Sequence, residues 1–155
     1  MNNNWKKRLI CWAIPLAVGG LAALLSGGMS SYRALNQPPL SPPGWVFPIV
    51  WTVLYLLMGE ASYRVLVSGK DSAEIRKALI AYGVQLFLNF LWPLFFFGGQ
   101  MYLTAFIVLI GLWVAIFITL QRFSKIDETA GDLLIPYLLW VTFAGYLNFG
   151  VFLLN

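Results

Sequence analysis

Five long apolar runs occupy most of this 155-residue chain and constrain its fold more than any other feature. A helix needs about 20 apolar residues to cross the hydrocarbon core of a bilayer. A soluble domain carries about 25% charged residues, whereas this chain carries 10%. The sequence therefore predicts one all-α transmembrane domain, residues 1–155, a five-helix bundle with spans at about 9–25, 46–67, 79–97, 102–120 and 133–154.

The basic residues predict how the bundle is oriented. With five spans, nine of the ten Lys and Arg residues fall on one side of the membrane, and Arg33 alone falls on the other. Lys and Arg are retained on the cytoplasmic side. We therefore expect a cytoplasmic N-terminus, with the C-terminus and the first loop outside, in a membrane of the bacterial plasma-membrane type. Topology also explains the net charge of +4, so no nucleic-acid partner is expected.

The residue types exclude several kinds of chemistry. The chain has no histidine and a single cysteine, Cys11. Histidine is the usual ligand of zinc, copper and haem iron and the usual general base near neutral pH. We therefore expect no metal site, no cofactor and no ordinary acid–base enzyme.

A proline-rich stretch separates the first two spans. Residues 38–51 contain five prolines, which fix φ and lack a backbone donor. Residues 38–44 should form a stiff non-helical loop. A helix can begin just after it with Pro48 in its first turn, where the missing N–H has no helical partner. The loop is either a preformed roof over a cavity or an ordinary connector.

Polar residues inside the spans are candidate functional residues, because burying them in lipid is costly. Glu60 and Arg64 lie one helical turn apart and are expected to pair. Gln85 and Asn89 share a face of the third span, where they either line a cavity or hydrogen-bond to other helices. The same alternatives hold for Asn148.

Aromatic and small residues leave further alternatives open. Trp51 and Tyr55 lie one turn apart on the second span, and Trp140 and Ala144 one turn apart on the fifth. These rings either pack in the core or line a cavity for a flat apolar ligand. The small-xxx-small pattern at 111–115 is a weak signal for a dimer seam, because packing within the bundle needs the same residues.

Several motifs resemble one family. The first loop and second span contain Tyr-x-x-Leu-x-x-Pro, Pro-Pro-Gly-Trp-Val-Phe-Pro and Trp-Thr-x-Leu-Tyr, and the third and fifth spans contain further matches. They lie at 32–38, 42–48, 51–55, 85–92 and 134–148. In order and position these motifs are similar to those of the TspO/MBR family, the tryptophan-rich sensory proteins and translocator proteins.

This resemblance implies five helices around a ligand pocket that is closed by the first loop, usually in a homodimer. It implies binding of porphyrins, notably protoporphyrin IX, and of synthetic isoquinoline carboxamides. The pocket positions carry over to Tyr32, Pro42, Phe47, Trp51, Tyr55, Asn89, Trp92, Trp140 and Ala144. Trp51 and Trp140 match tryptophans that are implicated in light-dependent porphyrin breakdown in bacterial relatives.

The chain also departs from the family pattern. Ser31 and Gln37 stand where the family often has Trp and Lys, so Arg33 is the only cation left on that side. We expect Arg33 to meet a propionate of the ligand. Tyr146 is followed by no Lys or Arg, so the proposed sterol motif is not supported.

Three functions remain in order of preference. The first is a membrane sensor or carrier that binds a metal-free tetrapyrrole. The second is light-dependent degradation of that ligand by Trp51 and Trp140. The third is a transporter, which typically shows internal repeats or broken helices. The chain shows no repeat, and only Pro93 suggests a break.

Overall fold

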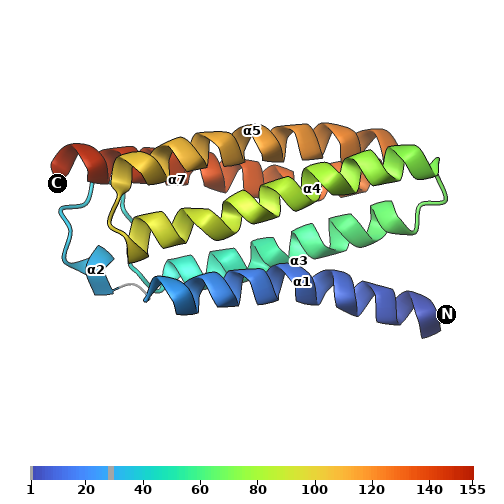
Figure 1. The fold of residues 1–155 in the computed structure, drawn as a ribbon, viewed down its shortest axis with the longest axis horizontal. Helices are drawn as coiled ribbons and strands as arrows, with labels where there is room; N and C mark the ends of the chain where they lie inside the picture. The colour runs from blue at the N-terminus through green and yellow to red at the C-terminus, as the bar shows by residue number, and fades with distance from the viewer. Residues whose placement is uncertain (1, 28–29) are drawn as a thin grey trace.

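The structure is a computed structural model that describes residues 2–27 and 30–155. All regular secondary structure within these ranges is helical, and five helical segments are long and apolar enough to cross a membrane. The long helices lie side by side along one axis, with the N-terminus at one end of the bundle and the C-terminus at the other (Figure 1). The predicted all-α bundle of five membrane-spanning helices is therefore confirmed.

The helices are longer than several of the apolar runs that predicted them. In chain order they are α1 (Asn2–Ser26), α2 (Ser30–Arg33), α3 (Val46–Leu66), α4 (Ser72–Pro93), the π-helix η1 (Leu94–Gly98), α5 (Tyr102–Ile126), α6 (Glu128–Leu133) and α7 (Ile135–Leu154). The extra turns of α1, α4 and α5 contain polar and charged residues, among which Lys, Arg, Gln and Glu are good helix formers. The last apolar run forms α7, which follows the short α6 after Leu134.

Nine of the ten basic residues lie at the end of the bundle that holds the N-terminus and the α3–α4 connection (Figure 1). Arg33 ends α2, at the opposite end of the bundle. We call these the basic end and the loop end.

Helices α1 and α3 approach each other closely at Gly59. A Cβ built on Gly59 would lie 2.7 Å from the carbonyl oxygen of Cys11 and 2.8 Å from Cα of Trp12. Pro15 lies one turn after Cys11 and has no N–H to donate to that carbonyl. The backbone of α3 therefore packs against a stretch of α1 that lacks one of its helical hydrogen bonds.

The prediction that Glu60 pairs with Arg64 was wrong. Glu60 instead accepts two hydrogen bonds from Arg8, from Nε and Nη2, both at 3.0 Å, and one from Nε1 of Trp12 at 3.0 Å. Arg64 pairs with Asp127 at 3.2 Å. Both acids bind cations on other helices, so these ion pairs join α3 to α1 and to the start of α6. We call Arg8, Trp12 and Glu60 the Glu60 cluster.

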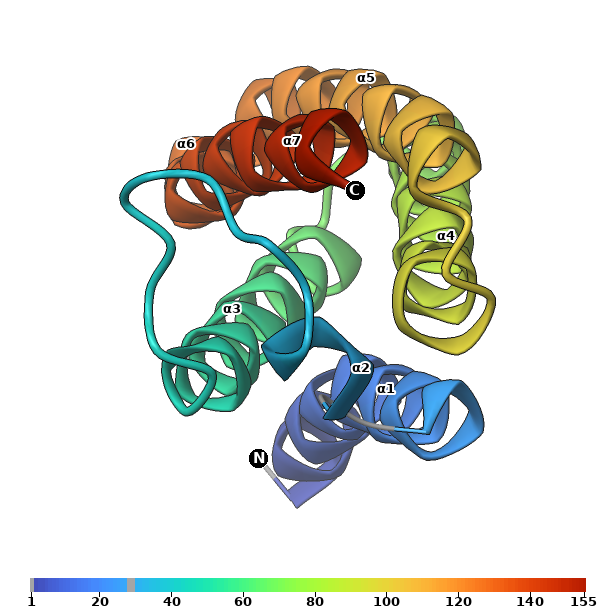
Figure 2. The ribbon, with the colours of Figure 1, turned by 90° about the vertical axis from the view of Figure 1, so that its left-hand side faces the viewer.

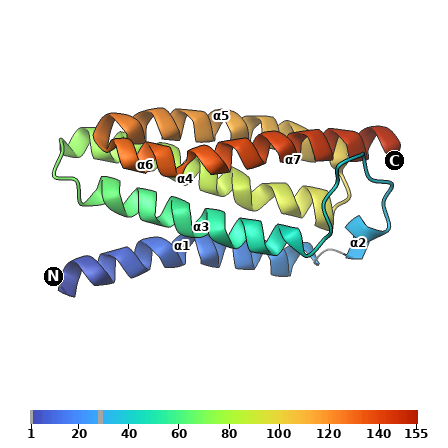
Figure 3. The same cartoon turned by 180° about the vertical axis from the view of Figure 1, so that it is seen from behind.

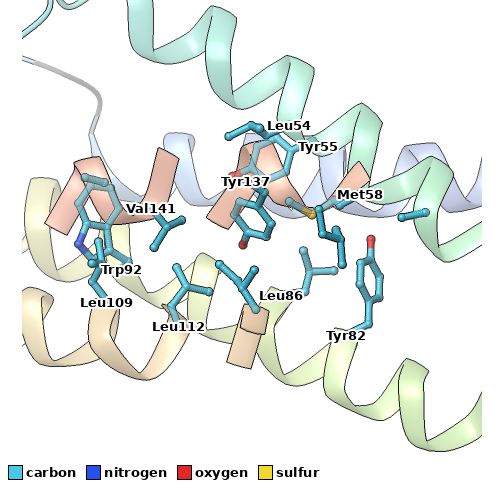
Figure 4. Packing of buried hydrophobic residues seen from close by; sticks show 14 of the residues in the cluster. Leu54, Tyr55, Met58, Tyr82, Leu86, Trp92, Leu109, Leu112, Tyr137 and Val141 are labelled. Carbon is cyan, nitrogen blue, oxygen red and sulfur yellow. The ribbon is translucent and has the colours of Figure 1, made fainter. Parts of the chain in front are cut away.

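Buried side chains of α3, α4, α5 and α7 form the hydrophobic core of the bundle (Figure 4). Tyr137 and Val141 of α7 are fully buried, and Leu112 of α5 is 1% exposed. Ala115 is buried and Gly111 faces Leu88 of α4, with 3.9 Å between the leucine Cδ1 and a Cβ built on the glycine. The small residues at 111–115 therefore contribute to packing within the bundle.

The proline-rich loop is non-helical at residues 38–44, α3 begins at Val46, and Pro48 lies in its first turn, all as predicted. The loop runs from α2 to the end of α7 and back to α3 (Figures 2 and 3). The Tyr146 hydroxyl donates to the carbonyl of Pro39 at 2.6 Å. Gly150 leaves room for the Pro38 ring, 2.6 Å from a Cβ built at that glycine. The loop thus packs on α7.

Candidate functional site

A cavity of about 300 Å³ lies between α1, α3 and α4 towards the loop end. Its walls combine aromatic rings, small residues and one amide. The lining residues are Leu16, Gly19, Gly20, Ala23 and Ser26 of α1; Phe47, Pro48, Trp51, Thr52 and Tyr55 of α3; and Asn89, Trp92, Pro93 and Phe97 of α4 and η1. A mostly apolar cavity with few convergent polar groups is the usual form of a small-molecule site.

The aromatic rings of the cavity come from α3 and from α4 with its continuation η1, opposite α1. The ring centroids of Trp51 and Tyr55 lie 5.6 Å apart on α3. Trp92 and Phe97 face each other edge to face at 5.7 Å. Large rings in these arrangements offer flat apolar surface to a ligand and lose little conformational entropy on binding.

Asn89, the amide side chain among the described lining residues, belongs to a buried hydrogen-bond chain. The Tyr55 hydroxyl donates to Oδ1 of Asn89 at 2.9 Å, and Nδ2 of Asn89 donates to the Tyr137 hydroxyl at 2.7 Å. That hydroxyl donates in turn to Oε1 of Gln85 at 2.7 Å. This Asn89 chain (Tyr55, Asn89, Tyr137, Gln85) joins α3, α4 and α7, so both alternatives predicted for Asn89 hold together.

The two other amide residues predicted as candidates, Gln85 and Asn148, pack between helices and lie outside the cavity lining. Gln85 is 1% exposed and does not line the cavity, and its Nε2 has no partner among the described residues. Asn148 accepts from Nε1 of Trp92 at 2.8 Å and donates to the carbonyl of Tyr102 at 2.8 Å. Asn148 thereby fixes the orientation of a ring that lines the cavity.

Helix α4 does not unwind at Pro93 but continues as the π-helix η1. The backbone N–H of Gly99 donates to the carbonyl of Leu94 at 2.8 Å, five residues earlier. Pro93 and Phe97 both line the cavity. Single π-helical turns of this kind are frequent at functional sites. The wider turn therefore helps to shape the cavity wall.

Tyr32 lies beside the cavity and outside its lining. It is 2% exposed, and its ring packs against Phe47, Phe96 and Phe97 with centroid separations of 5.4, 6.1 and 6.1 Å. Burial raises the pKa of the Tyr32 hydroxyl above its usual value. Tyr32 therefore supports two rings that do face the cavity.

Five of the ten predicted site residues line this cavity: Phe47, Trp51, Tyr55, Asn89 and Trp92. Pro42 lies half-buried in the loop, Ala144 is buried in the core, and Arg33 is exposed at the end of α2. The Trp140 ring packs against Phe47 at 5.9 Å. Trp140 lines a different surface, an outer groove between α3 and α7.

That outer groove is a weaker candidate site. Its volume is about 520 Å³, and it is lined by aliphatic residues together with Pro136, Trp140 and Phe143. Ile49 and Leu139 on its sides are 57% and 64% exposed. Its described lining residues are apolar apart from the Trp140 indole, and it faces outward, as expected for a helix surface that contacts lipid chains.

Sequence reasoning missed the wall that α1 contributes. Leu16, Gly19, Gly20 and Ala23 carry no aromatic or polar group that would mark them as site residues. Gly19 is required for shape, because a Cβ at this position would overlap the Tyr55 ring. The only signal was the Gly19-Gly20 pair, which indicates close approach without saying what approaches.

The fold and the cavity define an integral membrane protein with an aromatic chamber inside a five-helix bundle. Residues 11–154 match the profile of the TspO/MBR family, so the chain belongs to this family, which confirms the predicted resemblance.

Relatives match over most or all of their length. The chain is 37% identical to tryptophan-rich protein TspO of Chlorobaculum tepidum over 157 residues, covering 100% of this chain and 99% of the relative. It is 39% identical to the tryptophan-rich sensory protein of Cereibacter sphaeroides, covering 100% and 95%. It is 36% identical to the translocator protein of Ovis aries, covering 79% and 73%.

Proposed function

We propose that this protein binds a flat, apolar tetrapyrrole, with protoporphyrin IX as the leading ligand, and acts as a membrane sensor or carrier of it. The observation that carries the proposal is the cavity, in which Phe47, Trp51, Tyr55, Trp92 and Phe97 surround a single amide. Aromatic faces stack well on a flat ring system, and burial of that surface favours binding.

The size of the cavity bears on how a ligand enters. Its volume of about 300 Å³ is at the lower end of the range of about 300–1,000 Å³ for ligand sites. A macrocycle therefore requires the walls to move apart on binding. We assign this movement to α1 and to the loop at 34–45, and we propose that the loop closes over the bound ligand.

The metal-free macrocycle fits this chain better than haem, because the chain has no histidine to bind the iron. We propose that the exposed Arg33 approaches a propionate of the bound ligand. Replacing Arg33 with Ala should weaken protoporphyrin binding more than binding of an uncharged isoquinoline carboxamide. Equal losses for both ligands would contradict this role.

Light-dependent degradation of the ligand is the second candidate, and the position of Trp51 supports it. Trp51 lines the cavity and lies 5.6 Å from Tyr55 and 6.2 Å from Tyr137, measured between ring centroids. A tryptophan beside a photoexcited porphyrin is placed to donate an electron to it. Trp140 lies behind Phe47, so its contribution should be smaller.

One experiment tests both candidates. Purified protein in detergent is titrated with protoporphyrin IX in the dark while tryptophan fluorescence is followed, and the absorption spectrum is then recorded under light. Saturable quenching with an unchanged spectrum supports the sensor or carrier. A new absorbing product supports degradation.

Matched variants sharpen this experiment. Trp51→Phe should weaken binding or abolish the product more than Trp140→Phe does, because Trp51 lines the cavity and Trp140 does not. An absence of saturable binding in the unaltered protein would refute the proposed function.

The orientation and the assembly belong to the same proposal. The gathering of basic residues at one end supports a cytoplasmic N-terminus in a bacterial plasma membrane. Family resemblance supports a homodimer. Protease or thiol-reagent access from each side of sealed vesicles tests the first, and light scattering of the purified protein tests the second.

A further inference from the structure

A second, chemically different groove lies between α4 and α5 near the basic end. Its volume is about 350 Å³. It is lined by Lys77, Ile80, Ala81 and Val84 of α4 and by Ala115, Ile118 and Arg122 of α5. Ile80 and Val84 are 57% and 50% exposed, so the groove opens to the outside of the bundle.

The two cations lie at the same end of this groove. Lys77 is near the start of α4 and Arg122 near the end of α5, and the two helices run in opposite directions (Figure 1). From Lys77 the apolar strip continues to Val84, which is about 10 Å along a helix axis. The small side chains of Ala81 and Ala115 leave the groove open between the bulkier isoleucines.

The charges around the groove favour an anion at that end. Arg122 makes no ion pair within residues 2–27 and 30–155. Lys77 has one acidic neighbour, Glu74, at 3.8 Å between Nζ and Oε1, and the two side chains are 59% and 52% exposed. A long, exposed pair of this kind is weak. Both cations are therefore free to bind another anionic group.

We propose that this groove binds an anionic glycerophospholipid, with its phosphate between Lys77 and Arg122 and one acyl chain along Ile80, Val84 and Ile118. Arginine and lysine are the usual phosphate-binding side chains. An apolar strip that begins directly below two cations matches the order of headgroup and chain in such a lipid. Basic pockets between membrane helices bind anionic lipid headgroups in this manner.

A second copy of the chain fits this surface less well. Two copies related by a twofold axis at the groove would bring Lys77 and Arg122 close to the same cations of the partner. Such like-charge contacts oppose association. The mixed chemistry of the groove therefore favours a lipid over a dimer contact.

Native mass spectrometry of the purified protein tests the site, with phosphatidylglycerol and phosphatidylcholine of the same chain length added in turn. Each cation near the surface should contribute about a fivefold preference, so the two together should favour phosphatidylglycerol by about thirty-fold for the first bound lipid. Absence of any preference in the unaltered protein overturns the proposal.

Two charge-matched double variants separate this site from general surface charge. Lys77→Gln with Arg122→Gln should abolish the preference. Arg76→Gln with Lys125→Gln removes the same charge at the same end, but neither residue lines the groove, so the preference should remain. Equal losses in the two variants would show that the basic end attracts lipid without a site and would overturn the proposal.

A third variant tests the acyl-chain part with both cations kept. Ala81→Phe fills the groove and should weaken phosphatidylglycerol binding several-fold, because the chain loses its contact surface. Unchanged binding would overturn the groove assignment. Addition of inorganic phosphate distinguishes a lipid from a free anion, since displacement of the lipid by phosphate alone would also contradict the proposal.

Discussion

The two sides of the cavity are built very differently. Helix α3 has 44% of its most apolar window buried, whereas α1 has 22%. Helices α3 and α4 are tied to α7 through the Asn89 chain. Helix α1 contacts α3, α4 and η1, and it contributes mainly small and aliphatic side chains to the cavity. The wall formed by α3 and α4 is therefore fixed by buried hydrogen bonds. The wall formed by α1 has a smaller buried share and is held at the cavity mainly by apolar contacts.

This difference indicates which wall moves when a ligand binds. Moving α3, α4 or α7 apart would break hydrogen bonds in an apolar interior, and leaving such groups unpaired is costly. Among the described residues, the hydrogen bonds that join α1 to another helix come from Arg8 and Trp12, so moving the loop-end half of α1 mainly separates apolar contacts around the cavity. The Glu60 cluster and the Gly59 contact hold α1 nearer the basic end. We therefore expect α1 to open at the loop end.

The largest expected effect is at Gly59. Gly59→Leu places a side chain against the α1 backbone at Cys11, and backbone cannot move aside as a flexible side chain can. We expect the free energy of unfolding to fall by about 3 kcal/mol or more. Denaturant titration of the protein in micelles measures it. Gly83→Ala on α4 is the control, because a Cβ there meets nothing within 4 Å; equal effects would refute the close approach.

Asn89→Leu tests the fixed wall. The substitution removes two hydrogen bonds and leaves the Tyr55 hydroxyl without its acceptor. We expect a loss of about 2 kcal/mol of stability together with weaker ligand binding. Ser68→Ala removes the hydrogen bond that the Ser68 hydroxyl accepts from the Lys70 N–H in the exposed α3–α4 connection and should cost less than about 0.5 kcal/mol, because water replaces it. A larger effect at Ser68 would reverse the comparison between interior and surface.

Glu60→Gln tests how firmly α1 is held at the basic end. It removes the charge that Arg8 pairs with, in a site where the two side chains are 30% and 22% exposed. We expect a loss of about 1 kcal/mol, since solvent screens such a pair. Glu74→Gln, at the exposed pair with Lys77, serves as the matched control and should change stability by less than about 0.5 kcal/mol.

The smallest effect on stability, with a clear effect on binding, is expected at Gly19. Gly19→Ala forces α1 and the Tyr55 ring apart and should cost less than about 1 kcal/mol, because the loop-end half of α1 can shift. Affinity for the ligand should fall about tenfold, since about 1.4 kcal/mol of ring contact is lost. Gly20→Ala also lies in the cavity wall but meets nothing within 4 Å. Similar binding losses in both variants would exclude the ring displacement.

The number of spans was predictable because the bilayer imposes a length and a polarity on each helix. The start of α3 was predictable because the prolines before it cannot be helical. The partner of Glu60 was not predictable, since Arg64 satisfies the local spacing rule while Arg8 lies on another helix. How one helix is rotated against another depends on packing, and in this case on Gly59 and Pro15, which a local pattern does not reveal.

The cavity was only partly predictable for the same reason. Trp51 and Asn89 stand out as aromatic or polar residues within a span, whereas Gly19 and Ala23 matter because they are small. Trp140 looks equivalent to Trp51 in sequence. One ring turns into the cavity and the other into the outer groove, and the rotation of α7 decides which.

The Glu60 cluster also has a consequence for how the chain assembles in the membrane. All three of its residues lie within the first two spans, and so does the Gly59 contact with Cys11. These two helices can therefore pair as a hairpin while the rest of the chain is still being synthesised. The Asn89 chain needs Tyr137 and closes only when the last span inserts. The later helices then pack onto this early hairpin, and the cavity is complete only after α4 and η1 have inserted.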